Sequence, residues 1–168
     1  RITMTLLAKD KQKLPENSKH PAIEISSLTY RYPGTNIDVL NIDEWHVAAG
    51  EQIFLQGASG SGKSTLLQLL CGLRVASGDL SIAGTSMSEL SPVKRDRFRA
   101  QHIGMVFQQF NLIPYLSALD NVLLAANLAG KTKTAKARAT QLLDQVGLAQ
   151  AARKQPANTL SIGQKQRV

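Results

Sequence analysis

The sequence predicts an α/β domain, and three observations support this prediction. The apolar run Ile53 to Leu55 is short and unbroken, as in a strand that is buried on both faces. A glycine-rich segment follows this run directly, and Ser64 to Gly72 then has the composition of a helix that ends in glycine. Strand-like segments dominate before residue 114, and helix-like segments dominate after it.

Residues 1–21 differ from the rest of the chain. They are polar, contain Pro15 and Pro21, and show no sustained hydrophobic period, which predicts a mobile leader. The remaining residues, 22–168, are predicted to form one partial domain. Its predicted divisions are a β-rich part at 22–114, a helical subdomain at 115–160 and a terminal motif at 160–168.

The β-rich part is expected to begin with antiparallel strands, because the apolar residues at 23–28 precede a turn-like sequence at 32–34. The predicted strands are at 23–28, 39–47, 53–55, 78–84 and 103–107. The predicted helices are at 64–72, 92–100, 117–129, 133–146 and 148–154. Gly147 is expected to end the helix at 133–146.

The composition excludes several classes of protein. The chain has 168 residues, of which 43% are hydrophobic, and this is enough for a buried core. The single cysteine, Cys71, excludes an intramolecular disulfide framework. There is no window of about 18 apolar residues that could span a membrane. The apolar stretch at 2–8 is too short, and too soon followed by Lys9, for a secretory signal.

The formal net charge of +8 at pH 7 raises the question of nucleic-acid binding. Aromatic residues make up only 5% of the chain and do not alternate with the basic residues, as a base-stacking surface requires. The basic clusters are therefore interpreted as solvated faces, or as contacts with acidic partners or lipid headgroups, and no nucleic-acid partner is expected. The clusters are Lys94, Arg95, Arg97 and Arg99; Lys131, Lys133, Lys136 and Arg138; and Arg153, Lys154, Lys165 and Arg167.

The glycine-rich segment matches the phosphate-loop pattern G-x-x-x-x-G-K-[ST] in full. Glycines allow backbone conformations that other residues resist, and they let N–H groups approach phosphate oxygens closely. The helix that follows directs the positive end of its dipole at the same oxygens. The residues of the loop are Gly57, Ala58, Ser59, Gly60, Ser61, Gly62, Lys63 and Ser64.

Lys63 and Ser64 indicate which phosphate ligand the loop takes. Lys63 places a full positive charge near the β- and γ-phosphates, and the Ser64 hydroxyl can coordinate Mg²⁺. ATP and Mg²⁺ are therefore the expected cofactors. A chance match to the pattern is expected in about one chain of this length per hundred or fewer, given the usual frequency of glycine.

Three further motifs resemble those of the ABC-type transport ATPases. Residues 160–168 resemble the family's signature motif Leu-Ser-Gly-Gly-Gln, residues 103–114 resemble its Q-loop, and Tyr32 matches the aromatic residue of its A-loop. The order of these motifs is the family's order. The resemblance covers about residues 22–168 and implies a P-loop NTPase fold of the ABC type. In that family, part of the core follows the signature, so it is expected to be missing from these 168 residues.

The resemblance implies roles for Tyr32 and Gln108. Tyr32 would stack on the adenine base, an interaction worth about 1–3 kcal/mol by analogy with nucleic-acid sites. Tyr30 lies two residues earlier, and only the family spacing selects Tyr32. Gln108, rather than Gln109, would reach Mg²⁺ or the attacking water from the end of the strand predicted at 103–107.

The signature motif is expected to act at a second copy of the chain. Ser161 has the character of a helix N-cap, so its helix would present free N–H groups. The resemblance implies that Ser161 and Gly163 contact the γ-phosphate held by the other subunit, and that Gln164 supports the turn. Ile162 stands where the family usually has glycine. Because the first turn of a helix needs a negative φ, Ile162 is expected to be tolerated if its side chain faces away from the nucleotide.

The expected site can be stated as three sets of residues. The catalytic set is Lys63, Gln108, Ser161 and Gly163. The nucleotide-binding set is Tyr32, Gly57, Ala58, Ser59, Gly60, Ser61, Gly62, Lys63, Ser64, Thr65, Gln108, Ser161, Gly163 and Gln164. The metal ligands are Ser64 and Gln108.

The resemblance also implies a function. Gln108 and Leu160 lie 52 positions apart with helical sequence between them, whereas chromosome-maintenance members of the family carry a long coiled coil there. Residues 107–114, followed by residues 119–122, resemble the lipoprotein-release, macrolide-export and cell-division group. Such a protein would be the ATP-binding subunit of a transporter. It would form a head-to-tail dimer around ATP and act on transmembrane permease subunits, peripherally, on the cytoplasmic side of the cell (inner) membrane.

Two alternatives remain open from the residues. One is a soluble ABC-type ATPase that acts on nucleic acid or ribosomes, which only the basic charge supports. The other is a P-loop kinase of small molecules, which Gln108 and the signature disfavour. The family's Mg²⁺-binding Asp, catalytic Glu and switch His follow the signature, so the 168 residues by themselves are expected not to hydrolyse ATP.

Overall fold

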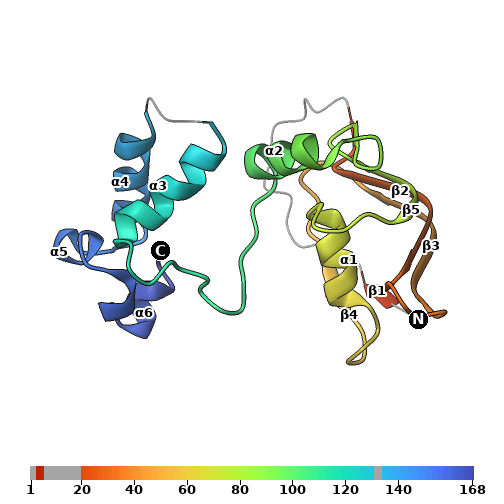
Figure 1. Cartoon of the computed structure of the whole chain (residues 1–168), viewed down its shortest axis with the longest axis horizontal. Helices are drawn as coiled ribbons and strands as arrows, with labels where there is room; N and C mark the ends of the chain where they lie inside the picture. Colours follow the sequence, from red (N-terminus) through yellow and green to blue (C-terminus); the bar gives the residue numbers. More distant parts are fainter. Residues whose placement is uncertain (1–2, 6–19, 131–133) are drawn as a thin grey trace. The chain divides into compact units, whose positions relative to one another are not determined.

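The computed structural model describes residues 3–5, 20–130 and 134–168 (Figure 1). These residues form two compact units, of which the first ends at Asp96 and the second begins at Arg97. Most of the predicted leader, residues 1–2 and 6–19, lies outside the described residues, and so does Lys133 at the predicted start of a helix.

The first unit contains an antiparallel sheet whose strands lie in the order β3-β2-β5-β6. Strand β2 is central, because Ile25 lies opposite Trp45 of β3 on one side and opposite Leu80 of β5 on the other. Ile25 and Leu80 are both buried. This sheet confirms the predicted antiparallel β portion. Its strands are β2 at Ile23–Arg31, β3 at Asp38–Val47, β5 at Ser77–Ile82 and β6 at Thr85–Ser86.

A change of register in the central strand sets which of its residues enter the core. The pairing of β2 with β5 shifts between Ser26 and Thr29. Such a bulge inserts an extra residue and resets the alternation of side chains between the two faces. Leu28 and Tyr30 are therefore buried along with Ile25.

Strand β4, Phe54–Gln56, corrects two predictions. It pairs with β1, Thr3–Thr5, in an antiparallel two-stranded ribbon, so part of the predicted leader is a strand. The expected burial on both faces is also wrong, since the Phe54 side chain is 54% exposed. A two-stranded ribbon covers little of its own surface, and it needs packing on both sides before its central residues are enclosed.

Helix α1, Lys63–Leu70, follows β4 through the glycine-rich segment, which confirms the predicted order of strand, loop and helix. Leu66 and Leu69 have no exposed surface. They lie three residues apart and therefore share one face of the helix. Helix α1 packs against β3, so the end of the loop is anchored to the sheet.

The strand predicted at 103–107 is absent from the structure. Helix α2, Pro92–His102, runs beyond its predicted end, and residues 103–107 then form no regular element. Val106 is fully exposed and Phe107 is about half exposed, at 49%. A strand must pair its backbone N–H and C=O groups with a neighbour, and no described strand pairs with these residues.

The second unit is helical and has one apolar core. Alanine and leucine side chains from its helices and connecting segments are buried together, and Leu112 and Val168 pack against them. The core residues are Ala118, Leu143, Leu148, Ala152, Ala157 and Leu160. The helices are α3 at Ala118–Leu128, α4 at Ala135–Gln145, α5 at Gln150–Arg153 and α6 at Ile162–Lys165, with a 3-10 turn at Ala157–Thr159. Gly147 follows α4 with a φ of 69°, as predicted for the end of that helix.

Candidate phosphate-binding site

The glycine-rich loop has a backbone that requires glycine at position 62, its last glycine. Gly62 is the N-cap of α1 and has a φ of 94°, a conformation that residues with a Cβ resist. A Cβ at this position would lie 2.8 Å from Cδ2 of Leu40 and 3.0 Å from the carbonyl oxygen of Val39. The absence of a side chain therefore allows the loop to turn and to pack closely on β3.

The beginning of the loop depends on glycine for a different reason. A Cβ on Gly57 would lie 2.7 Å from Oγ of Ser61, so a larger residue would displace that hydroxyl. The backbone N–H of Ser61 donates to the carbonyl oxygen of Ala58 at 3.2 Å. The loop thus folds back on itself between β4 and α1.

The first turn of α1 is suited to an anion. Its N-cap residue, Gly62, makes no side-chain hydrogen bond to the helix, and the first turn contains no acidic residue. The first N–H groups of a helix have no partner within the helix, and the helix dipole is positive at this end. An anion in the loop would meet both the N–H groups and the dipole.

The ammonium group of Lys63 lies within the curve of the loop. Its Nζ atom donates to the carbonyl oxygens of Gly57 and Ala58, each at 2.7 Å, and lies 3.4 Å from Oγ of Ser61. Carbonyl oxygens carry a partial negative charge, so phosphate oxygens could replace them as partners of the same cation. Ser64, the predicted Mg²⁺ ligand, follows in the first turn of α1 and is exposed.

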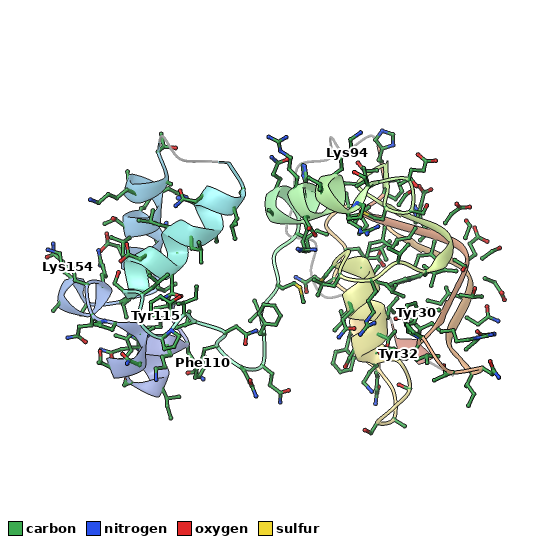
Figure 2. All side chains as sticks on the ribbon, in the orientation of Figure 1. Tyr30, Tyr32, Lys94, Phe110, Tyr115 and Lys154 are labelled. Atoms are coloured by element: carbon green, nitrogen blue, oxygen red, sulfur yellow. The ribbon has the colours of Figure 1, made fainter. Side chains whose placement is uncertain are left out.

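Tyr32 lies beside the same helix. Its hydroxyl oxygen is 2.8 Å from Oγ1 of Thr65, whose side chain is only 5% exposed. The rings of Tyr30 and Tyr32 meet edge to face, with centroids 5.2 Å apart (Figure 2). Tyr30 is 7% exposed and belongs to the core of the sheet, whereas Tyr32 follows the end of β2 and is partly accessible.

Sequence reasoning missed Arg74 and Gln68, which complete this group of side chains. The Arg74 guanidinium lies over the Tyr32 ring, 4.8 Å from its centroid, and its Nε donates to Oε1 of Gln68 at 2.5 Å. No motif marks either residue. One pattern in the sequence could have indicated Gln68: it lies three residues after Thr65, and this helical spacing places both residues on one face of α1.

The second unit holds the other predicted site residues. Gln108 is exposed in an irregular segment, not at the end of a strand as predicted. Ser161 is the N-cap of α6, as predicted, and forms a capping box with Gln164. The backbone N–H of Gln164 donates to Oγ of Ser161 at 3.3 Å, and Oε1 of Gln164 accepts from the Ser161 N–H at 2.8 Å.

Ile162 and Gly163 begin helix α6. Ile162 is 70% exposed and does not have a positive φ, which confirms the expected helical backbone. A Cβ on Gly163 would meet no atom within 4 Å. Because Gly163 also lacks a positive φ, the described fold does not require glycine at this position.

Backbone hydrogen bonds join the segment that follows Gln108 to the segment that precedes Ser161. The N–H of Asn158 donates to the carbonyl oxygen of Pro114 at 3.0 Å, and the N–H of Ala157 donates to that of Leu116 at 2.9 Å. Leu112 packs against the core that contains Leu160. The structure therefore brings these two motifs into one unit, and it brings Tyr32, the glycine-rich loop, Ser64 and Thr65 into the other.

The described residues contain neither a metal cluster nor a membrane span. No group of three or more His, Cys, Asp or Glu side chains could hold a metal ion there. None of the described helices combines the length and the apolar character that crossing a membrane requires.

The chain is similar to proteins of known families. It is 42% identical over 143 residues to a macrolide export ATP-binding/permease protein, MacB, of Rhodopirellula baltica, a match that covers 83% of this chain and 21% of that protein. It is 46% identical over 123 residues to a lipoprotein-releasing system ATP-binding protein, LolD, of Xanthomonas euvesicatoria pv. vesicatoria, covering 72% of this chain and 50% of that protein. The chain thus spans about a fifth of the length of the first relative and half of the length of the second.

The fold is also similar to a solved structure. The ATP-binding cassette MJ0796, solved as a dimer in a post-hydrolysis state with ADP and Pi, matches with a TM-score of 0.65 and 28% identity. The match covers 86% of this chain and 66% of that one. Residues 40–168, which are more than half of the chain, match the ABC transporter family. Together with the loop, the Lys63 ammonium within it and the capped α6, this match shows that the chain belongs to the ABC transporter family.

Proposed function

We propose that this chain is the nucleotide-binding part of an ABC transporter and that it binds ATP with Mg²⁺ at residues 57–65. The observation that supports this most strongly is the position of the Lys63 ammonium, which lies inside the glycine loop on two carbonyl oxygens at 2.7 Å. A triphosphate would take over this cation and add the N–H groups at the start of α1. The loop thus offers a phosphate both a cation and the N–H groups of a helix start.

The other site residues in the first unit have distinct roles in this proposal. Ser64 coordinates Mg²⁺ through its exposed hydroxyl. Tyr32 stacks on the adenine base, and Tyr30 does not, because Tyr30 is enclosed in the core of the sheet. The hydroxyl of Thr65 is bonded to Tyr32, so this residue meets the phosphates through its backbone N–H and holds Tyr32 through its side chain.

The residues of the second unit act on the terminal phosphate. Gln108 contacts Mg²⁺ or the attacking water. Ser161 and Gly163 bind the γ-phosphate of a second copy of the chain, in a head-to-tail dimer around two nucleotides. Gln164 supports this contact because it closes the capping box with Ser161. The open space around Gly163 supports a contact from outside the subunit, because the fold itself leaves room for a larger residue there.

Hydrolysis of ATP and transport belong to the complete protein in this proposal. The named relatives are a macrolide export ATP-binding/permease protein and a lipoprotein-releasing system ATP-binding protein, which supports transmembrane permease subunits as the partner. A peripheral position on the cytoplasmic side of the membrane is part of the same proposal. The 168 residues alone are proposed to bind ATP without turnover.

Calorimetry with the full chain tests ATP binding at the loop. Wild-type protein is titrated with ATP in the presence of Mg²⁺, beside Lys63→Ala and Lys94→Ala. Lys94 is an exposed lysine of α2 (Figure 2) and serves as the matched control for loss of one positive charge. We expect Lys63→Ala to lose binding and Lys94→Ala to retain it. Equal affinities of wild type and Lys63→Ala would contradict the proposal.

A further inference from the structure

Arg74 is held by three side chains of the first unit. Its Nη1 atom donates to the hydroxyl of Tyr30 at 2.8 Å, and its Nε atom donates to Oε1 of Gln68 at 2.5 Å. The guanidinium carbon lies 4.8 Å from the centroid of the Tyr32 ring and 5.8 Å from that of Tyr30. The two hydrogen bonds hold the guanidinium in place, and its central carbon lies over the Tyr32 ring.

Tyr32 is thereby restrained on three sides. Arg74 covers a face, Tyr30 contacts the ring at 84° between the ring planes, and Thr65 is bonded to the hydroxyl. The ring of Tyr32 is therefore fixed in position.

The restraints connect the base to the phosphates. Thr65 and Gln68 both belong to α1 and lie three residues apart on one face of that helix. The same helix begins at Lys63, directly after the glycine loop. A shift of Arg74 would move Tyr32 relative to the helix that receives the phosphates. The distance between the base-stacking residue and the phosphate loop therefore depends on the Arg74 side chain.

We propose that Arg74 is a positioning residue for nucleotide binding, which orients Tyr32 for stacking on the base. This inference rests on the proposed function, because it requires that Tyr32 meets the adenine. Arginine is required here because its planar fork can donate in two directions while its face lies on an aromatic ring. Lysine has a single point charge and cannot do both.

If Arg74 acts through Tyr32, its replacement should weaken binding of the base and leave binding of the phosphates unchanged. Two ligands, one with a base and one without, test this. Binding of ATP and of inorganic tripolyphosphate, which has no base, is measured by calorimetry with Mg²⁺ on the full chain. The variants are Arg74→Lys and Arg74→Gln. Arg97→Lys is the control, since Arg97 is an exposed arginine of α2. A cation–π contact of this kind predicts that both Arg74 variants bind ATP about three- to tenfold more weakly, while tripolyphosphate binds as to wild type.

The outcomes differ for each way of failing. Unchanged ATP affinity in folded Arg74 variants overturns the inference. An equal loss of affinity for both ligands also overturns it, because it would show that Arg74 only stabilises the fold. If wild type binds tripolyphosphate and ATP equally, Tyr32 does not stack and the inference fails while the loop assignment stands. If wild type binds neither ligand, the proposed function itself fails.

A second variant keeps the test valid if Arg74→Gln does not fold. Tyr30→Phe removes the hydroxyl that accepts from Arg74 and retains the ring that touches Tyr32. It is expected to weaken ATP binding in the same direction, by about two- to threefold, with tripolyphosphate unchanged. A thermal melt of each variant establishes that it is folded before the ligands are compared.

Discussion

The hydroxyl oxygen of Tyr32 lies 2.8 Å from Oγ1 of Thr65. This hydrogen bond joins the residue that follows strand β2 to the first turn of helix α1, so a residue from the sheet is fixed to the helix that begins at the phosphate loop. Thr65 is 5% exposed, and this bond satisfies a hydroxyl that would otherwise be buried without a partner.

A double-mutant cycle tests the bond between Tyr32 and Thr65. Tyr32→Phe and Thr65→Val each remove one hydroxyl and keep the shape of the side chain. A single neutral hydrogen bond predicts a coupling free energy of about 1 kcal/mol in urea unfolding. Fluorescence of Trp45, the only tryptophan in the chain, reports on the unit that contains both residues. Strictly additive effects would show that the hydroxyl groups do not interact.

Replacing two glycines of the loop by alanine is predicted to lower the free energy of unfolding by different amounts. Gly60 and Gly62 have φ values of 78° and 94°, so alanine is strained at both by about 1–2 kcal/mol. Only at Gly62 would the new Cβ also approach Leu40 and Val39, at 2.8 and 3.0 Å. Gly62→Ala should therefore lower the free energy of unfolding by at least about 1 kcal/mol more than Gly60→Ala does. Equal losses, measured with urea and Trp45 fluorescence, would contradict the close packing on β3.

Gly163→Ala is predicted to separate folding from assembly. The position has no positive φ, and a Cβ added there would have no atom within 4 Å, so the free energy of unfolding should change by less than about 1 kcal/mol. A side chain there would enter the proposed contact with the partner's γ-phosphate. We expect that Mg-ATP makes wild-type protein dimeric in light scattering and that Gly163→Ala stays monomeric. A Gly163→Ala protein that dimerises as wild type does would remove Gly163 from the interface.

Asn121 is predicted to stabilise the segment that follows Gln108. Its side chain makes four hydrogen bonds to backbone groups of residues 113–117, with distances of 2.7 to 3.3 Å. Asn121→Ala removes the acceptor of the Ile113 N–H, while the three carbonyl oxygens keep backbone donors, and the loss should cost about 1–3 kcal/mol. Urea unfolding followed by circular dichroism reports on this helical unit. Asn127→Ala, at an exposed position of the same helix, is the control and should be nearly neutral.

Local patterns predicted the elements that local chemistry determines. The strand, glycine loop and helix around Lys63 lie within one short stretch of sequence, and the structure has them in that order. The cap at Ser161 was equally predictable, because a serine followed three residues later by glutamine forms its own hydrogen bonds. Such features need no information from distant residues.

Features that depend on distant partners were not predictable. The run at 103–107 has the composition of a strand, yet strand formation requires a neighbour to pair with it, and composition does not supply one. Phe54 is exposed for a related reason, since its burial depends on what covers the ribbon. Arg74 and Tyr30 lie 44 positions apart, so nothing local indicates that they meet.

The central claim is that the segment 57–65 receives the phosphates of ATP. It is tested most directly by titrating Mg-ATP into the isotope-labelled 168-residue chain and following the backbone amide signals by nuclear magnetic resonance. The account predicts that the largest changes fall on residues 58–65, with a smaller change at Tyr32, and that residues 161–164 change only where the protein dimerises. Saturable ATP binding that leaves the amides of 58–65 unchanged would contradict it.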